Sequence, residues 1–159
     1  MRPFYRASQF FRAFRRVDVG AIRTSTAECL SAEQTGLFGR MSLYDQQHAV
    51  DVLGRLRAEG HAKPELMQAA LLHDAGKAFI RANLWRRVAH VLLWAVRTEA
   101  DTPGEYARHA EIGAQMAERA GSSPMVVALI REHHNAPRRA PQTEFEKLLA
   151  ALQKADESA

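Results

Sequence analysis

Cysteine is almost absent from this chain of 159 residues, in which Cys29 is the only one. A single cysteine excludes an internal disulfide framework and a thiolate metal cluster. Any metal in this protein is therefore expected to bind through histidine and carboxylate side chains. The scarcity of cysteine also favours a reducing compartment, and we expect a cytoplasmic location.

Long apolar runs are missing as well. The apolar stretches are short, as in residues 91–96, whereas a transmembrane helix needs about 20 predominantly apolar residues. We therefore expect no integral membrane contact. The N-terminus also lacks the uninterrupted apolar core of a signal peptide, so secretion is not expected.

Signals for β-structure and for glycine-rich phosphate loops are absent too. No segment shows the bounded, alternating pattern of β-branched residues that is typical of a strand, and no glycine-rich loop follows such a segment. These absences argue against P-loop and Rossmann nucleotide sites. The chain is predicted to be all-α, and its length suits one domain with a sizeable core.

What the sequence does contain is a series of helix signals. Thr143 and Glu146 have the spacing of a capping box, and the segment 135–142, which contains two prolines, is predicted to be a loop. Capping residues and apolar periodicity predict helices over residues 43–59, 64–72, 84–96, 105–120, 125–134 and 144–155.

The net charge of +4 is unevenly distributed, because the first 24 residues carry six arginines, interleaved with aromatic residues, against the single acid Asp18. Such a segment can contact an acidic membrane surface, a nucleic acid or a protein partner. The simpler interpretation is a helix that packs its aromatic side chains on the domain while its arginines stay in water. We assign residues 1–40 to a basic and aromatic helical extension, and residues 41–159 to the domain itself.

The most informative motif is His73-Asp74-Ala75-Gly76-Lys77, which follows the apolar run Ala69–Leu72. A neutral imidazole beside a carboxylate offers two kinds of metal ligand at one point of the fold. Lys77 follows His73 by four residues and can project from nearly the same helical face. A metal together with an ammonium group is suited to a phosphate ester.

Other residues of ligand type lie on both sides of this motif, and together they occupy five predicted helices. Inward-facing histidines and acids on several helices are how a helical bundle builds a metal site in its core. Asp74 could bridge two ions, because a carboxylate has two oxygens. The candidate ligands are His48, His73, Asp74, His109, His133, His134 and Asp156.

Donors of this kind favour Mn, Fe, Co, Ni or Zn, whereas Mg prefers sites made entirely of oxygen. We therefore expect one or two divalent transition-metal ions as cofactors. The number of ions stays open at this point.

The pattern resembles the HD-domain superfamily of metal-dependent phosphohydrolases, a compact all-α fold. ALLHDAGK is similar to its central signature, and LQKADESA resembles the helix that carries its last aspartate. RHAEIGAQMAERAG and LIREHH resemble the branch that binds a second ion. The resemblance covers the chain from about Ser42 to the C-terminus.

The resemblance implies a role for each candidate residue. Asp74 would bridge the two ions, and Lys77 would contact the substrate phosphate. His48, His73 and Asp156 would complete the first ion's ligands, and His109, His133 and His134 those of the second.

One departure limits the expected substrate. The cyclic-di-GMP phosphodiesterases of this superfamily carry a Gly-Tyr-Pro stretch after their histidine pair, whereas residues 135–139 of this chain read Asn-Ala-Pro-Arg-Arg. The resemblance therefore does not extend to cyclic-di-GMP hydrolysis.

The sequence predicts a metal-dependent phosphohydrolase that acts on a small phosphorylated compound, with a nucleotide as the favoured class. Asp74 would orient the ions and could accept a proton from the attacking water, and Lys77 would offset the charge that develops on the phosphoryl group. Arg81, Arg138 and Arg139 are candidate phosphate contacts, although each is more simply a surface arginine.

The alternative is a metal-stabilised helical module with weak or no catalysis that binds a nucleotide or a protein partner. Nucleic-acid binding has no support beyond the arginine-rich N-terminus, and the sequence leaves open whether the protein forms a homo-oligomer.

Overall fold

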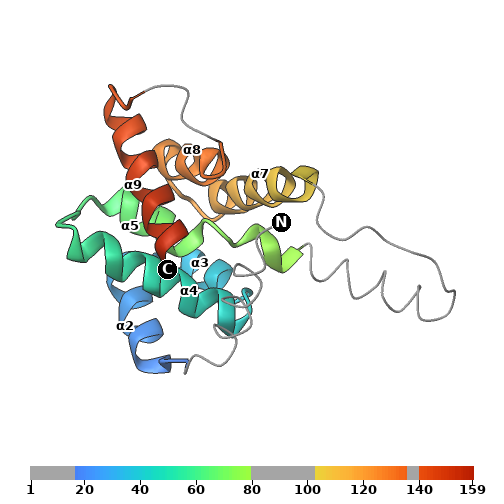
Figure 1. The fold of residues 1–159 in the computed structure, drawn as a ribbon. Helices are drawn as coiled ribbons and strands as arrows, with labels where there is room; N and C mark the ends of the chain where they lie inside the picture. Colours follow the sequence, from blue (N-terminus) through green and yellow to red (C-terminus); the bar gives the residue numbers. More distant parts are fainter. Residues whose placement is uncertain (1–16, 80–102, 136–139) are drawn as a thin grey trace, which may run out of the picture.

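The computed structural model describes residues 17–79, 103–135 and 140–159, and every regular element within these ranges is an α-helix. The predicted all-α architecture is confirmed (Figure 1). The helices are α2 (Val19–Cys29), α3 (Ala32–Phe38), α4 (Leu43–Ala58), α5 (Pro64–Leu72), α7 (Pro103–Arg119), α8 (Pro124–Glu132) and α9 (Glu144–Ser158).

The helix ends follow the local signals in the sequence. The Ser42 side chain accepts a hydrogen bond from the backbone N–H of Asp45 at the start of α4, and Thr143 and Glu146 form the predicted capping box of α9. Gly60 adopts a positive φ of 84° just after α4, a conformation that costs glycine little. Helix α7 begins at Pro103, two residues earlier than predicted, since proline is well suited to the first turn. The helix predicted over residues 84–96 lies outside the described residues.

Two helices come from the segment that we assigned to an N-terminal extension. Helix α3 starts with a capping box in which Ser31 and Gln34 bond each other's backbone N–H groups. Helices α2 and α3 pack against α5, and Ile22, Leu37 and Phe38 belong to the same buried core as the rest of the described chain. Residues 1–16, with most of the arginines of the extension, lie outside the described residues.

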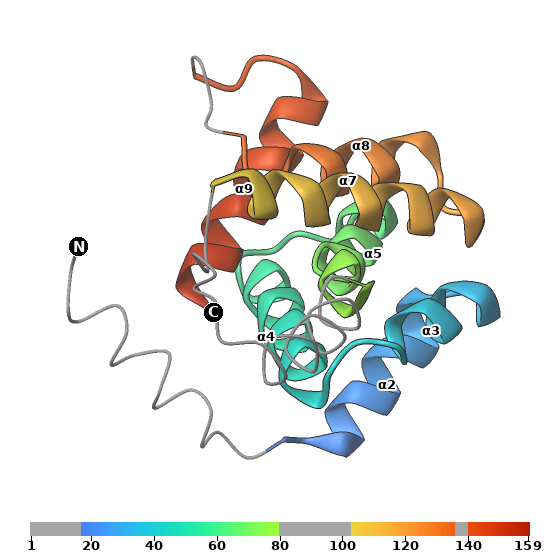
Figure 2. The ribbon, with the colours of Figure 1, turned by 90° about the vertical axis from the view of Figure 1, so that its right-hand side faces the viewer.

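The core is centred on α5. Figure 2 shows this helix beside α4 and below α7 and α8, and α5 packs directly against α4 and α8. Leu66, Leu71 and Leu72 have no exposed side-chain surface, because α5 is apolar on nearly all sides. The residues that directly follow α5, beginning with His73, are therefore placed in the core.

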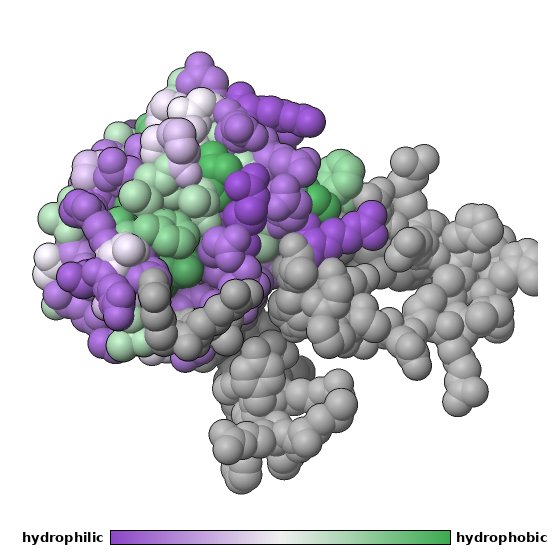
Figure 3. All heavy atoms as spheres, turned by 90° about the horizontal axis from the view of Figure 1, so that it is seen from above, coloured by the Kyte–Doolittle hydropathy of each residue, from purple (hydrophilic) through white to green (hydrophobic). Residues whose placement is uncertain are grey.

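The described surface is mixed in character. Seen from above, hydrophilic side chains surround a smaller area of hydrophobic residues (Figure 3). Among the described helices, none has the length and apolar character that crossing a membrane requires.

Candidate metal centre

The candidate centre begins where α5 ends. His73 caps the C-terminus of this helix, and a turn through Asp74 and Ala75 leads to Lys77. Because α5 is central, the two polar residues are carried into the interior: His73 is 0% exposed and Asp74 is 1% exposed. Burying such groups is costly unless they are bonded or coordinated.

Two buried imidazoles are held in a defined orientation by backbone carbonyls. His73 Nδ1 lies 2.9 Å from the Ala70 carbonyl oxygen, and His133 Nδ1 lies 2.6 Å from that of Ile130. A carbonyl oxygen only accepts hydrogen bonds, so Nδ1 carries the proton in each ring. The neutral form of each histidine therefore directs a lone pair from Nε2 toward the interior, the arrangement typical of metal-binding histidines.

Three buried polar atoms have no hydrogen-bond partner in the part of the chain that the structure describes. They are His73 Nε2, Asp74 Oδ1 and His133 Nε2. Buried polar groups in folded proteins are nearly always satisfied, so three such atoms in one cluster need an explanation. A cation shared between them would provide it.

Five helices and the turns that follow them supply the ligand-type residues. The donor atoms of each group in the cluster lie within 4.8 Å of one another. Atoms that share an ion at about 2.1 Å are at most about 4.2 Å apart, so a small contraction would suffice to bind one. The first group consists of His48, His73 and Asp74, and the second of Asp74, His109, His133 and His134.

Asp156 completes the side of the cluster that His48 and His73 occupy. Its Oδ1 accepts a hydrogen bond from His48 Nε2 at 2.8 Å and lies 3.5 Å from His73 Nε2. Helix α9 thus brings its carboxylate next to the first group.

Asp74 is the member common to both groups. Its Oδ2 lies 3.5 Å from His73 Nε2, and its Oδ1 lies 3.5 Å from His109 Nε2. Lys77 Nζ donates to Oδ2 at 2.5 Å, and this ion pair raises the pKa of Lys77 even though burial opposes its charge. The position of Asp74 between the two groups is what a bridging carboxylate requires.

The histidines of the cluster differ in the direction of their pKa shifts. Burial would lower the pKa of His73, but Asp74 and Asp156 outweigh it and raise this pKa to about 9. Burial would raise the pKa of Asp74, yet His73 holds it well below its usual range. Burial above all lowers the pKa of His133 to about 3 and that of His134 to about 4. At neutral pH the carboxylates are ionised and His133 and His134 are neutral, which are the ligand forms of these side chains, whereas His73 carries a second proton that an ion bound at Nε2 would displace.

The remaining histidines extend the second group toward the surface. His109, on α7, is 3% exposed, and its Nε2 lies 3.0 Å from His134 Nε2. His134 is exposed at the end of α8. The predicted phosphate contacts Arg81, Arg138 and Arg139 lie outside the described residues.

Two supporting features were not predicted from the sequence. Gln153 donates hydrogen bonds to the carbonyl oxygens of His133 at 3.1 Å and Asn135 at 2.8 Å, and so ties the end of α8 to α9. The sequence did contain a signal for this role, because Gln153 lies one helical turn before Asp156 and therefore on the same face of the helix. Gly76 lies against α7, where an added Cβ would come within 2.0 Å of the His109 carbonyl oxygen.

The fold and the cluster together define a class of protein: an all-helical domain with a buried group of histidines and aspartates able to hold divalent metal. Comparison with protein-family models adds the family. The HD domain model matches residues 46–158, and the chain belongs to this family, whose superfamily comprises metal-dependent phosphohydrolases. Searches of curated proteins and of solved structures found no match.

Proposed function

We propose that this protein is a metal-dependent phosphohydrolase that acts on a small phosphorylated compound. The observation that carries the proposal is a set of three buried atoms without a hydrogen-bond partner among the described residues, beside the ammonium group of Lys77. They are His73 Nε2, Asp74 Oδ1 and His133 Nε2. A nucleotide is the favoured substrate class, and that part of the proposal rests on the resemblance to the superfamily. The proposal includes a cytoplasmic location, which the single Cys29 favours.

The donor set suits two ions, with Asp74 as a ligand of both. The first ion would be held by His48, His73, Asp74 and Asp156, and the second by Asp74, His109, His133 and His134. Sites that combine imidazole nitrogen with carboxylate oxygen favour Mn, Fe, Co, Ni or Zn over Mg.

Bound divalent ions supply Lewis-acid activation of water and of the phosphoryl oxygens. Hydrolysis joins the water oxygen to phosphorus, breaks the bond to the leaving oxygen and transfers a proton between them. The lowered pKa of Asp74 keeps its carboxylate ionised, which favours its role as a ligand over its role as a proton acceptor. Lys77 keeps its proton, because Asp74 raises its pKa, and its positive charge offsets the charge that develops on the phosphoryl group.

Lys77 is placed to contact both the Asp74 carboxylate and a substrate phosphate. Its side chain is 35% exposed, whereas that of Asp74 is 2% exposed, so the ammonium group lies between the buried carboxylate and solvent. A phosphate that approaches the cluster from this side meets the positive charge first.

The test compares the native protein with Lys77→Met and Asp74→Ala. Protein purified without chelator is analysed for metal content, and hydrolysis of nucleoside mono-, di-, tri- and cyclic phosphates is measured with Mn, Co or Ni added. We expect Lys77→Met to retain its metal and its fold while kcat falls about 100-fold or more, as when one group that stabilises developing charge is removed. Asp74→Ala should lose metal and turnover together.

The alternative function, a metal-stabilised binding module, predicts a different outcome. It would retain metal in the native protein and show no hydrolysis of any of these phosphates. Native protein that binds metal yet hydrolyses none of the substrates would overturn the enzyme proposal.

A further inference from the structure

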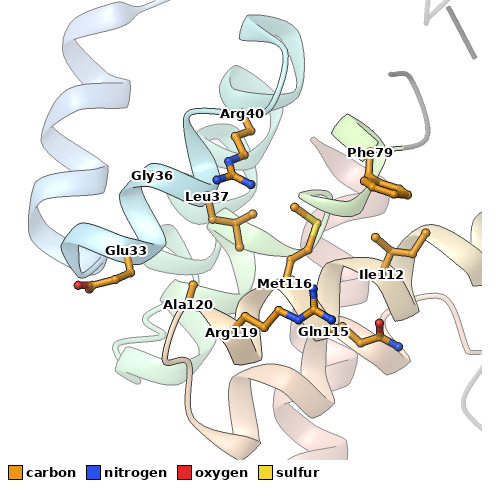
Figure 4. A pocket seen from close by; sticks show the side chains of 10 residues that line it. All are labelled: Glu33, Gly36, Leu37, Arg40, Phe79, Ile112, Gln115, Met116, Arg119 and Ala120. Atoms are coloured by element: carbon orange, nitrogen blue, oxygen red, sulfur yellow. The ribbon is translucent and has the colours of Figure 1, made fainter. Parts of the chain in front are cut away.

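A groove separate from the metal centre runs between α3 and α7. It has a volume of about 740 Å³, and none of the candidate metal ligands lines it (Figure 4). Its apolar lining comes from Leu37, Phe79, Ile112 and Met116. We call this feature the α3–α7 groove.

Two arginines reach the α3–α7 groove from opposite walls. Arg40 follows the end of α3 and Arg119 ends α7, and Figure 4 shows the Arg40 head group beside Leu37 and that of Arg119 between Met116 and Gln115. Within the described ranges neither guanidinium has an ion-pair partner, whereas Arg57 pairs with Glu28 at 2.8 Å.

The acid that lines the α3–α7 groove does not neutralise these arginines. The Glu33 carboxylate accepts a hydrogen bond from the Ser31 hydroxyl at 2.9 Å, in the first turn of α3. In Figure 4 its side chain points away from both arginines. The groove therefore combines an apolar lining with an arginine on each of its two walls.

We propose that the α3–α7 groove binds a small anionic amphiphile, with an apolar body against Leu37 and Met116 and a carboxylate between Arg40 and Arg119. Arginine presents a planar fork of donors that matches a carboxylate. The volume of the groove lies within the range of about 300–1,000 Å³ that is typical of small-molecule sites. A free small molecule fits this enclosure better than a protein partner, which needs about 800 Å² of surface on each side.

Gly36 allows the α3–α7 groove to be blocked without disturbing the core. It lines the groove, and a Cβ added there would meet nothing within 4 Å. Gly54, on α4, is a matched control, because an added Cβ there also meets nothing within 4 Å and the residue does not line the groove. Replacing a helical glycine also favours the helix, so neither Gly36→Phe nor Gly54→Phe should unfold the protein.

The test titrates the full chain with decanoate below its micelle concentration, with binding measured by isothermal calorimetry. We expect one saturable site in the native protein and in Gly54→Phe, and no binding in Gly36→Phe. The double variant Arg40→Gln/Arg119→Gln should bind about tenfold more weakly or worse, because the charge-assisted hydrogen bonds are lost. Decanol, which has no charge, should bind more weakly than decanoate to the native protein.

Three results would overturn the proposal. One is equal binding of decanoate by Gly36→Phe and the native protein. Another is decanoate binding that Asp74→Ala abolishes and Arg40→Gln/Arg119→Gln leaves unchanged, which would place the carboxylate at the metal centre instead. The third is binding to vesicles of anionic lipid without binding to free decanoate, which would indicate a membrane surface as the partner.

Discussion

Gly76 sets how closely the turn after α5 can approach α7. A Cβ at this position would lie 2.0 Å from the His109 carbonyl oxygen and 2.8 Å from the Gly113 backbone nitrogen. Both obstacles are backbone atoms and cannot rotate away, so any side chain must push the two segments apart. The residue matters for the centre because Asp74 and His109 lie on the two sides of this contact, with Asp74 Oδ1 3.5 Å from His109 Nε2.

At the residue scale we predict that Gly76→Ala separates Asp74 from His109. The overpacking should lower the free energy of unfolding by about 1–3 kcal/mol, and the protein should bind fewer metal ions per chain. Denaturant unfolding and metal analysis check the two effects. Gly54→Ala is the control, since its Cβ has open space, and it should leave metal content unchanged and stabilise α4 by roughly 0.5–1 kcal/mol. Full metal content in Gly76→Ala would show that α7 does not need this close approach.

Helix α9 contacts residues of both groups of candidate ligands. Asp156 accepts a hydrogen bond from His48, and Gln153, one turn earlier, donates to the carbonyl oxygens of His133 and Asn135. The Asp156 carboxylate therefore contacts the side chain of His48, a candidate ligand. The Gln153 amide contacts His133 only through its backbone and so positions that ligand. The amide is a positioning group, because it contacts the backbone rather than a ligand atom.

At the element scale we predict that Gln153→Leu loosens the end of α8. Two carbonyl oxygens lose their donor, which should cost about 1–3 kcal/mol of unfolding free energy. Metal titrations should show weaker binding at the second group while the first group, held by Asp156, is less affected. Lys154→Ala is the control on the same helix, since its exposed ion pair with Glu59 is worth at most about 1 kcal/mol. Equal losses of affinity at both groups would argue against the positioning role.

The whole molecule is organised around a polar centre in an apolar core. Helices α4, α5, α7, α8 and α9, or the turns that follow them, each bring at least one ligand-type residue to the cluster. Without an ion, the helices meet at buried atoms, such as His133 Nε2, for which the described part of the chain provides no hydrogen-bond partner. An ion would both satisfy these atoms and connect the helices.

At the scale of the whole molecule we predict that metal stabilises the fold. Chelator treatment should lower Tm by several degrees, because an ion that binds only the folded chain adds stability in proportion to its occupancy. Differential scanning calorimetry with and without re-added metal measures the effect. Mn, Co, Ni or Zn should restore Tm better than Mg, since the donors are mostly nitrogen. An unchanged Tm after complete removal of metal, verified by metal analysis, would contradict the prediction.

Local signals predicted much of the fold. Ser42, Pro64 and Thr143 mark helix starts in the sequence and in the structure, because capping depends on residues a few positions apart. The bounds of α3 were not predicted within the helical extension assigned to residues 1–40, although Ser31 and Gln34 have capping-box spacing. Its burial depends on α5 and α7, which no local pattern specifies.

The sequence by itself determined the kind of chemistry in this protein. One cysteine and a scattered set of histidines and aspartates limit a metal to nitrogen and oxygen donors, and the apolar run before His73 places that pair in the interior. These are properties of residue identity and short spacing, which are present before the chain folds.

Only the tertiary structure decided which atoms meet. The 2.8 Å contact between His48 and Asp156 joins residues 108 positions apart, and the position of Asp74 between two groups depends on how closely α7 approaches Gly76. The α3–α7 groove likewise exists only because two distant helices leave space between them. Such distances follow from the packing of whole helices, and neighbouring residues in the sequence do not encode them.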